Sequence, residues 1–237
     1  MIEDKRQFVT RLFTTIANRY DLFNRLTSMT FDRTWRALAV RMSRLEPGVR
    51  VLDLCTGTGD LALACAEELR ALGGSGGRVV GADLCAPMLA IARRKAERRR
   101  AAVDWCFGDA LALPFRDGAF GRVLIGFSTR NLVNLPLGLR EMHRVLGPRG
   151  RLVILETGKP KARWFRVLYF LYLRTVVVAI GWLLFFKAWP FTYLQRSVAR
   201  FWEPHEFVRA LRDVGFRGVS YRGLGGGIAA LYVADKA

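Results

Sequence analysis

The first residues with a chemical signature lie in the turn from Asp53 to Asp60, which reads Asp-Leu-Cys-Thr-Gly-Thr-Gly-Asp and follows a short apolar run. Gly57 and Gly59 let a ligand approach the backbone closely, and the helix that follows offers free amides at its N-terminus. A dinucleotide fingerprint would place a pyrophosphate at that terminus. The carboxylate of Asp60 disfavours a pyrophosphate and suits a ligand that carries an ammonium group, which Asp53 can also serve.

Two more carboxylates follow the next two predicted strands. Asp83 ends the strand over 78–83, where a carboxylate can accept hydrogen bonds from both hydroxyls of a ribose; a helix N-cap is the alternative role. Asp109, in the sequence Gly108-Asp109-Ala110, follows the strand over 103–107. It can accept a bond from the amino group of an adenine while a neighbouring backbone amide reads a ring nitrogen. An ordinary loop carboxylate is the alternative there.

Together these sites predict a nucleoside-binding edge. The carboxyl ends of successive parallel strands meet at one edge of an open α/β sheet, and ligands bind there. An ammonium group, a ribose and an adenine are all parts of S-adenosylmethionine. We therefore predict S-adenosylmethionine as the cofactor, with Asp53, Gly57, Gly59, Asp83 and Asp109 at its site.

The segment after the fourth predicted strand, Phe127-Ser128-Thr129-Arg130-Asn131, bears on the type of reaction. It lacks the Asn-Pro-Pro-Tyr sequence that holds an exocyclic amine for N-methylation, which argues against methylation of nucleic-acid amino groups. Arg130 stays protonated and is a poor base, but an arginine stabilises a phenolate oxygen well. From the spacing alone, a surface arginine on a loop is an equal alternative.

A repeated order of strand, glycine turn and helix must position these residues. Strands are predicted over 50–54, 78–83, 103–107, 123–127 and 152–155. Their alternation with helices predicts βαβ units, and therefore an α/β fold with a mostly parallel sheet covered by helices on both faces. A helix over 207–214 and a hairpin over 219–233 would add an antiparallel edge and complete seven strands.

The segment over 164–194 is the most apolar part of the chain. The run from Thr175 to Phe186 holds no charge, but it is shorter than the roughly 20 residues that a spanning helix needs. Arg174 would also lie near the bilayer centre, which is costly. Trp164 and Trp182, near basic residues, suit a membrane interface. Contact with a membrane or a lipid tail, a buried pair of lid helices and, least favoured, a true span remain open.

Composition sets wider limits. The 237 residues are 51% hydrophobic and carry a net charge of +18. This charge fits an anionic membrane surface, nucleic acid or acidic ligands, or a plain arginine bias, because the basic residues are spread along the chain. The four cysteines form no CxxC pair and the chain has two histidines, so no metal site is predicted. Reduced thiols and the absence of an apolar N-terminal run predict a cytoplasmic protein.

Several motifs resemble those of the ubiquinone/menaquinone biosynthesis C-methyltransferases, over nearly the whole length of the chain. The elements Tyr20-Asp21-x-x-Asn24 and Phe127-x-x-Arg130-Asn131 are specific to that family, whereas the glycine turn is shared with a broader class. Further matching motifs are Ala110-x-x-Leu113-Pro114-Phe115, Glu141-Met142-x-Arg144-Val145-Leu146, Leu155-Glu156, Tyr193-Leu194-x-x-Ser197-Val198 and Gly215-Phe216.

The resemblance implies a Rossmann-like class I methyltransferase that methylates a ring carbon of a prenylated quinol, with demethylmenaquinol favoured. It implies a cofactor site that also uses Thr58 and Ala110, and Gly126 at a position where many members have serine. For the reaction on such a quinol, we expect Arg130 and Asn131 to hold the substrate oxygen and stabilise its anion. Tyr20 would bond that oxygen or relay its proton.

The resemblance and the elements together predict four parts. These are an N-terminal helical lid over 1–45, a cofactor-binding core over 46–160, an apolar helical lid over 161–200 and a C-terminal helix with hairpin over 201–237. The expected partners are the quinol and, peripherally, the inner face of the cell membrane, with no nucleic acid. A ubiquinone precursor, another lipid or small acceptor, and a basic nucleic-acid-binding protein are the alternatives. The sequence carries no signal for the oligomeric state.

Overall fold

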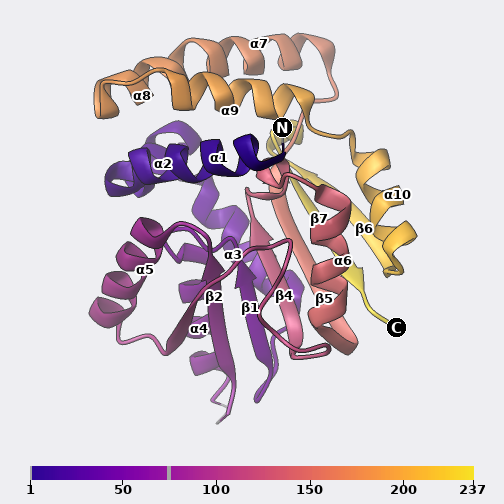
Figure 1. Cartoon of the computed structure of the whole chain (residues 1–237). Coiled ribbons are helices and arrows are strands. Elements are labelled where there is room, and N and C mark those ends of the chain that lie inside the picture. The colour runs from indigo at the N-terminus through magenta and orange to yellow at the C-terminus, as the bar shows by residue number, and fades with distance from the viewer. Residues whose placement is uncertain (1, 74–75) are drawn as a thin grey trace.

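The computed structural model describes residues 2–73 and 76–237, which form a sheet with helices on both faces and a cap of helices above it (Figure 1). The strands are β1 (Arg50–Leu54), β2 (Arg78–Asp83), β3 (Val103–Phe107), β4 (Phe120–Gly126), β5 (Leu146–Thr157), β6 (Arg217–Leu224) and β7 (Ala229–Asp235). The helices are α1 (Ile2–Ile16), α2 (Tyr20–Ser28), α3 (Phe31–Ser43), α4 (Asp60–Ala71), α5 (Ala86–Arg99), α6 (Leu135–Val145), α7 (Arg163–Arg174), α8 (Val176–Phe185), α9 (Trp189–Arg200) and α10 (Pro204–Val214).

The sheet has seven strands in the order β3-β2-β1-β4-β5-β7-β6. β1 to β5 pair in parallel, whereas β7 is antiparallel to both β5 and β6. This confirms the predicted Rossmann-like fold and its antiparallel edge. The strand order reverses at β1, which has β2 on one side and β4 on the other, and ligands bind beyond the carboxyl ends of the strands at such a switch point.

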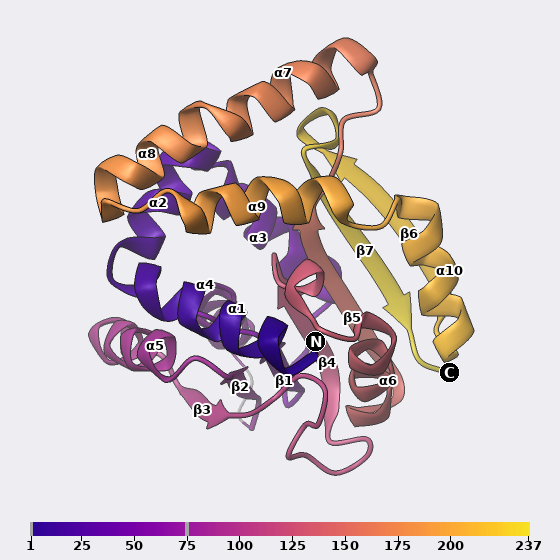
Figure 2. The same ribbon diagram turned by 45° about the horizontal axis from the view of Figure 1, so that its top comes forward.

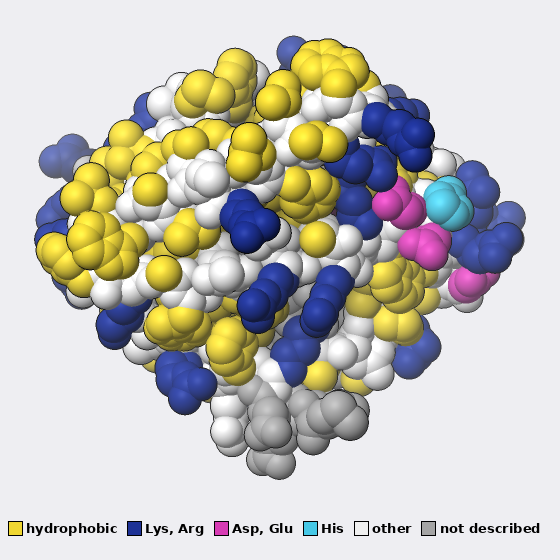
Figure 3. Space-filling model, turned by 90° about the horizontal axis from the view of Figure 1, so that it is seen from above, with side chains coloured by type: hydrophobic (Ala, Val, Ile, Leu, Met, Phe, Trp, Pro, Cys, Tyr) yellow, Lys and Arg dark blue, Asp and Glu magenta, His cyan; other side chains and the backbone are white. Residues whose placement is uncertain are grey.

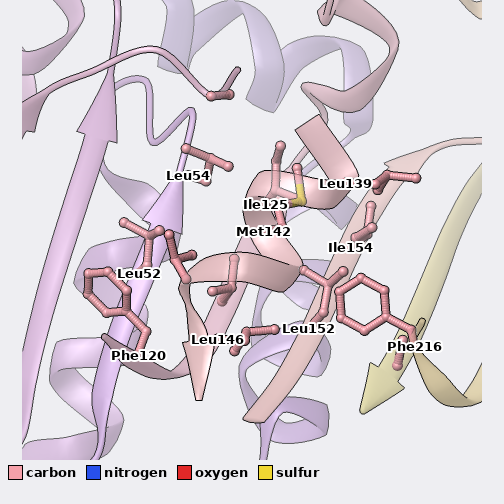
Figure 4. Packing of buried hydrophobic residues seen from close by; sticks show 14 of the residues in the cluster. Leu52, Leu54, Phe120, Ile125, Leu139, Met142, Leu146, Leu152, Ile154 and Phe216 are labelled. Atoms are coloured by element: carbon pink, nitrogen blue, oxygen red, sulfur yellow. The ribbon is translucent and has the colours of Figure 1, made fainter. Parts of the chain in front are cut away.

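The two faces of the sheet are covered by different helices because side chains alternate along each strand. Leu52 and Leu54 belong to the cluster under α6 and α10, part of which Figure 4 shows from close by. Val51 belongs to the opposite cluster, with residues of α3 and α4. The side chains of both clusters are almost inaccessible to solvent. This packing on both faces fixes the central strands, and with them the residues at their carboxyl ends.

A third apolar cluster holds the cap together. It joins Leu12 of α1 and Phe23 of α2 to Leu173, Val177 and Phe191 of the C-terminal cap helices. Figure 2 shows these helices together above the sheet. The N-terminal lid and the apolar lid, which were predicted from separate parts of the sequence, therefore pack against each other in one cap.

Some boundaries differ from the sequence prediction. α3 lies within the predicted lid over 1–45, yet its residues Ala39 and Val40 pack on the sheet. The strand predicted over 152–155 begins earlier, because Leu146 already pairs with Phe120 ahead of a bulge. A hydrophobic pattern locates a buried helix or strand without saying which surface buries it.

Among the described residues, one helical stretch, Arg163–Phe185, is long and apolar enough by length and composition to cross a membrane. Little of it is buried in the protein. It comprises α7 and α8, with Thr175 between them and Arg174 just before that residue. Both helices also contribute to the cap cluster, through Leu173 and Val177.

Candidate active site

The glycine turn after β1 brings the backbone close to its neighbours. Gly57 and Gly59 have φ of +56° and +82°, in the left-handed region that favours glycine. A Cβ at Gly59 would lie 2.7 Å from the ring of Trp105, so no side chain fits there. Asp53 is buried below the turn and accepts hydrogen bonds from the Thr56 hydroxyl and, at 2.9 Å, the Ala62 amide.

A cavity of about 990 Å³, counted with its open mouth, lies over the carboxyl ends of the strands. Its lining includes seven residues at or soon after the carboxyl ends of β1 to β4 that could contact a cofactor, namely Gly57, Thr58, Asp60, Asp83, Asp109, Ala110 and Gly126. Six of these are predicted cofactor-site residues, so the fold brings together most of that set. Asp53 and Gly59 do not line the cavity, because Asp53 lies beneath the turn and Gly59 faces Trp105.

Asp83 is tied to the glycine turn. Its Oδ2 accepts the Gly57 amide at 2.8 Å and its Oδ1 accepts the Cys85 amide at 2.8 Å. Burial raises the pKa of Asp83, although these amide bonds oppose the rise. The alternative reading of Asp83 as a helix N-cap does not hold, because the N-cap of α5 is Cys85.

Asp109 lies at the other end of the cavity. Its Oδ1 accepts the Leu111 amide at 3.0 Å, and its Oδ2 pairs with Arg6 of α1 at 3.1 Å. Half of the Arg6 side chain is exposed, so this pair contributes little stability. The carboxylate therefore keeps capacity for a further hydrogen bond.

The two carboxylates of the glycine turn differ in charge. Burial raises the pKa of Asp53 to about 7. Burial also acts on Asp60, but nearby Lys95 of α5 outweighs it and the pKa of Asp60 is lowered. Lys95 bonds Asp60 and, at 2.8 Å, Asp21 of α2, so Asp60 already has a cation within the protein. The predicted role of Asp60 toward a ligand ammonium group is correspondingly weaker.

The same contacts fasten the cap to the cofactor turn. The Thr58 hydroxyl donates to Asp21 Oδ1, and Lys95 Nζ donates to Asp21 Oδ2. Asp21 thus links α2, the glycine turn and α5. We refer to Asp21, Thr58, Lys95 and Asp60 as the latch.

A second and larger cavity, about 1980 Å³ with its mouth, lies between the cap and the sheet. Most of its lining is aromatic or aliphatic and includes Phe23, Trp35, Leu168, Tyr169, Leu173, Val177 and Leu224. Arg130 also lines it. Tyr20 and Arg36 line both cavities, so the polar cavity and the apolar one meet at these two side chains.

Arg130 and Asn131 lie in a short 3-10 turn after β4, at this junction. Arg130 Nη1 donates to Glu156 Oε1 and to the Phe127 carbonyl, each at 2.5 Å. Glu156 is fully buried and also accepts the Thr129 hydroxyl at 2.7 Å. Burial alone would lower the pKa of Arg130, but Glu156 reverses this and the pKa is raised, so Arg130 stays a cation.

In the turn after β4, two buried donors have no partner. These are Nε of Arg130 and Nδ2 of Asn131, whose Oδ1 accepts the Tyr193 hydroxyl at 3.2 Å. Buried donors are nearly always paired, and an unpaired one costs about 1–3 kcal/mol. The site therefore fits a ligand that brings an acceptor oxygen to this point.

The sequence analysis assigned no role to three residues that the site uses. Glu156 follows the fifth predicted strand directly, so the rule that singled out Asp83 could have found it. Arg36 lies on the same face of α3 as the buried Ala39 and Val40, and a charge on an apolar helix face is a detectable signal. Lys95 gave no signal, since it belongs to a run of basic residues at the end of α5.

Comparisons with known proteins agree with this geometry. Residues 1–236 match the family described as the ubiE/COQ5 methyltransferase family. A demethylmenaquinone methyltransferase of Thermus thermophilus is 44% identical over 225 residues, which cover 95% of this chain and all of that protein. A ubiquinone/menaquinone biosynthesis C-methyltransferase UbiE of Geotalea uraniireducens is 38% identical and covers 99% of both chains.

Solved structures match the fold at low sequence identity. A SAM-dependent methyltransferase from Aquifex aeolicus aligns with a TM-score of 0.61 at 19% identity, over 85% of this chain and 89% of that one. A putative methyltransferase of Haloferax volcanii, solved with the activator Trm112, aligns at 0.65 and 18% identity, over 94% and 96% of the two chains. These likenesses concern the fold alone.

Proposed function

The chain belongs to the ubiE/COQ5 methyltransferase family, and we propose that this S-adenosylmethionine-dependent methyltransferase converts demethylmenaquinol to menaquinol. Relatives at 44% and 41% identity, from Thermus thermophilus and Deinococcus radiodurans, are demethylmenaquinone methyltransferases. The observation that carries the proposal is the pair of unpartnered donors on Arg130 and Asn131, where a polar and an apolar cavity meet. A quinol with a prenyl tail has a polar ring oxygen and an apolar body that match this junction.

The residues of the polar cavity would hold the cofactor, which supplies an electrophilic methyl group when bound. In our proposal, Asp83 accepts the ribose hydroxyls, and Asp109 with the Ala110 amide binds the adenine. Thr58, Gly57 and Gly126 lie at the aminoacyl end. Asp53 and Gly59 act indirectly, by fixing the turn that carries Gly57 and Thr58.

Arg130 and Asn131 would activate the acceptor. Donation from Arg130 Nε and Asn131 Nδ2 to a ring hydroxyl stabilises its anion and lowers its pKa, which places negative charge on the adjacent ring carbon. That carbon would form the new bond to the methyl group as the bond between the methyl group and the cofactor's sulfur breaks, which leaves S-adenosylhomocysteine. Loss of the proton on that carbon would then restore the aromatic ring. Tyr20, which lines both cavities, would relay the proton from the hydroxyl.

The apolar cavity would hold the prenyl tail. Its walls come from α2, α3, α7 and α9, together with the start of α8, the segment after β4 and the loop after β6. Burying apolar tail surface contributes roughly 25 cal/mol per Å². The tail would therefore supply binding energy far from the ring, while Arg130 and Asn131 fix the position of the reacting atoms.

We propose that the protein is cytoplasmic and works at the inner face of the membrane, through α7 and α8. Trp182, Leu183 and Phe186 at the end of α8 are 55%, 66% and 74% exposed. Trp164, Val167 and Leu171 of α7 are also exposed. Figure 3 shows hydrophobic side chains gathered over this face, with basic ones among them and acidic ones only toward one edge.

The charge of this region supports the same proposal. From Thr157 to Trp202 the sequence has no acidic residue and eight basic ones, Lys159, Lys161, Arg163, Arg166, Arg174, Lys187, Arg196 and Arg200. Basic residues next to an exposed apolar face are attracted to anionic lipid at about 1 kcal/mol each near the surface. An amphipathic face that rests in the interface accounts for the exposure better than a span, because Leu173 and Val177 pack inside the cap.

The test is methyl transfer by the purified protein from labelled S-adenosylmethionine to a panel of reduced demethylated quinones. We expect label in the ring of demethylmenaquinol and little transfer to the oxidised quinone, which has no hydroxyl to ionise. Arg130→Ala should lower kcat at least about 100-fold while the Kd of S-adenosylhomocysteine changes less than about threefold. Arg116→Ala, at an exposed loop arginine, is the matched control.

Thermal unfolding of each variant shows whether it is folded. Equal turnover of Arg130→Ala at saturating quinol would contradict the role of Arg130. Preference for a ubiquinone precursor would overturn the menaquinone assignment, and labelling of none of the quinols would overturn the quinol proposal itself.

A further inference from the structure

Arg36 is a nearly buried cation that the reaction described above does not use. Its side chain is 13% exposed, and its Nε is buried without a hydrogen-bond partner. The nearest carboxylate, Asp32 one turn earlier in α3, lies 3.7 Å from that Nε, too far for a hydrogen bond. Asp32 Oδ1 instead accepts the Ser28 hydroxyl at 2.7 Å. Arg36 is therefore charged, largely desolvated and incompletely paired.

The position of Arg36 limits what it can bind. Its Nη1 lies 3.4 Å from the point where a side chain at Gly126 would begin, and its guanidinium stacks 5.3 Å from the ring centre of Phe127. These contacts place the guanidinium at the carboxyl end of β4, beside β1. The absence of a side chain at Gly126 leaves room for it there.

The other basic residue of the polar cavity, Arg6, lies beside Asp109 and away from Arg36. Among the described residues that line this cavity, Arg6 and Arg36 are the basic ones, and Arg6 pairs with Asp109. No described carboxylate accepts a hydrogen bond from Arg36. Asp60 bonds Lys95, and Asp53 bonds the turn below through Oδ2, while its buried Oδ1 has no partner. Nε of Arg36 is thus a donor that an acceptor group of a ligand could satisfy.

We propose that Arg36 binds the carboxylate of the aminoacyl end of S-adenosylmethionine and of its product. This rests on the proposed cofactor site, in which the adenine lies toward Asp109 and the aminoacyl end toward Gly57 and Gly126. A guanidinium binds a carboxylate through a charge-assisted and often bidentate pair, and such hydrogen bonds contribute about 1.5–3 kcal/mol. Because Arg36 also lines the apolar cavity, its pairing would fix the cofactor next to the quinol site.

The experiment compares two ligands by calorimetry, S-adenosylhomocysteine and its decarboxylated analogue, which keeps the ammonium group. We expect the wild-type protein to bind S-adenosylhomocysteine at least about tenfold more tightly. Arg36→Gln should weaken S-adenosylhomocysteine about 10–100-fold and change the decarboxylated analogue less than about threefold. Arg36→Lys should fall between the two. Arg33→Gln, at an exposed arginine of the same helix, should leave both affinities unchanged.

The outcomes separate this inference from the proposed function. If the wild-type protein binds S-adenosylhomocysteine but Arg36→Gln binds it equally well, Arg36 has another role and the inference is wrong. An equal loss for both ligands would also overturn it, since that would indicate a general change in the cavity. If the wild-type protein binds neither ligand, the proposed cofactor site itself fails.

Discussion

Glu156 forms a buried ion pair with Arg130, and the site depends on this pair. It has no exposed surface and binds Arg130, the Thr129 hydroxyl and the backbone amide of Arg130. Breaking a buried ion pair by removing one partner costs about 3–5 kcal/mol, because the remaining charge is left uncompensated. The pair thus fixes the orientation of the Arg130 guanidinium, and replacing either residue should destabilise the protein.

We expect Glu156→Gln to destabilise the protein by about 3 kcal/mol or more, measured by urea denaturation at pH 7. Glu67→Gln is the control, since Glu67 pairs with Arg99 on the surface, where an ion pair contributes less than about 1 kcal/mol. A Glu156→Gln variant as stable as the control would mean that Arg130 does not depend on this carboxylate.

Asp53 predicts a pH dependence of stability. Its pKa of about 7 in the folded protein lies above the ordinary value near 4. The folded state therefore holds the proton more tightly, and the stability this provides is present below pH 4 and lost as the pH rises to about 7. Over that interval the loss attributable to Asp53 is at most about 4 kcal/mol.

Asp53→Asn removes this titration. Denaturation between pH 4 and 8 should show the wild-type curve falling, relative to that of Asp53→Asn, as the pH increases. Other groups titrate in both proteins, so the difference between the two curves isolates Asp53. Parallel curves would show that Asp53 is ionised in the folded protein with an ordinary pKa.

At this scale the sequence predicted the site residues at strand ends, apart from Glu156, and missed those brought in by tertiary packing. Asp83 and Asp109 could be found because parallel strands align their carboxyl ends. Arg36 and Lys95 reach the cavity from helices, and their position depends on how α3 and α5 pack. No local pattern encodes that packing, although the apolar face of α3 offered a hint for Arg36.

At the scale of elements, the latch couples the cap to the cofactor turn. α2 is short and amphipathic, and its polar link to the core runs through Asp21 to Thr58 and Lys95. Loss of the Asp21 charge should leave Lys95 paired with Asp60 alone and weaken the attachment of α2. The latch is thus a polar contact between the cap and the cofactor turn, beside the apolar contacts of the cap.

We expect Asp21→Asn to speed amide hydrogen exchange in α2 about five- to tenfold, the effect of about 1 kcal/mol. Exchange in α10, which packs on the far sheet face, should not change. Asp104→Asn, at an exposed residue of β3, is the control. Unchanged protection of α2 would show that its apolar contacts with Phe191 and Phe185 alone hold it in place.

Most helices and strands could be predicted from the periodicity of apolar residues, but the elements against which they pack could not. The strands β1, β2 and β3 agree with the sequence prediction because turn residues bound each apolar run. α3 was assigned to the lid, since its apolar face does not reveal whether it packs on a helix or on the sheet. Long-range pairing decides this, and a single sequence does not contain it.

For the molecule as a whole, the cap has two different surfaces. Its inner surface forms the apolar cavity, and its outer surface exposes large hydrophobic residues among arginines and lysines. The sequence left open whether 164–194 is a lid or an interface segment. The structure gives this segment an inner packed side, and the proposed membrane contact concerns its outer side.

Co-sedimentation with lipid vesicles tests the membrane proposal. The protein should bind vesicles containing phosphatidylglycerol at least about tenfold more strongly than phosphatidylcholine vesicles, because several basic residues face the lipid. Leu183→Glu should weaken binding about tenfold, the effect of losing one inserted side chain of 1–2 kcal/mol. Leu72→Glu, at the end of α4 remote from the cap, is the control. Equal binding of both vesicle types would contradict the role of charge.

A crystal structure with S-adenosylhomocysteine and a short-tailed demethylmenaquinol would test the proposed site most directly. We expect the adenine beside Asp109 and a ring oxygen within hydrogen-bond distance of Arg130 Nε and Asn131 Nδ2. The tail should enter the cavity under α7. A quinol ring bound away from Arg130 and Asn131, or a nucleoside outside the cavity formed by Gly57, Asp83 and Asp109, would contradict the proposed site.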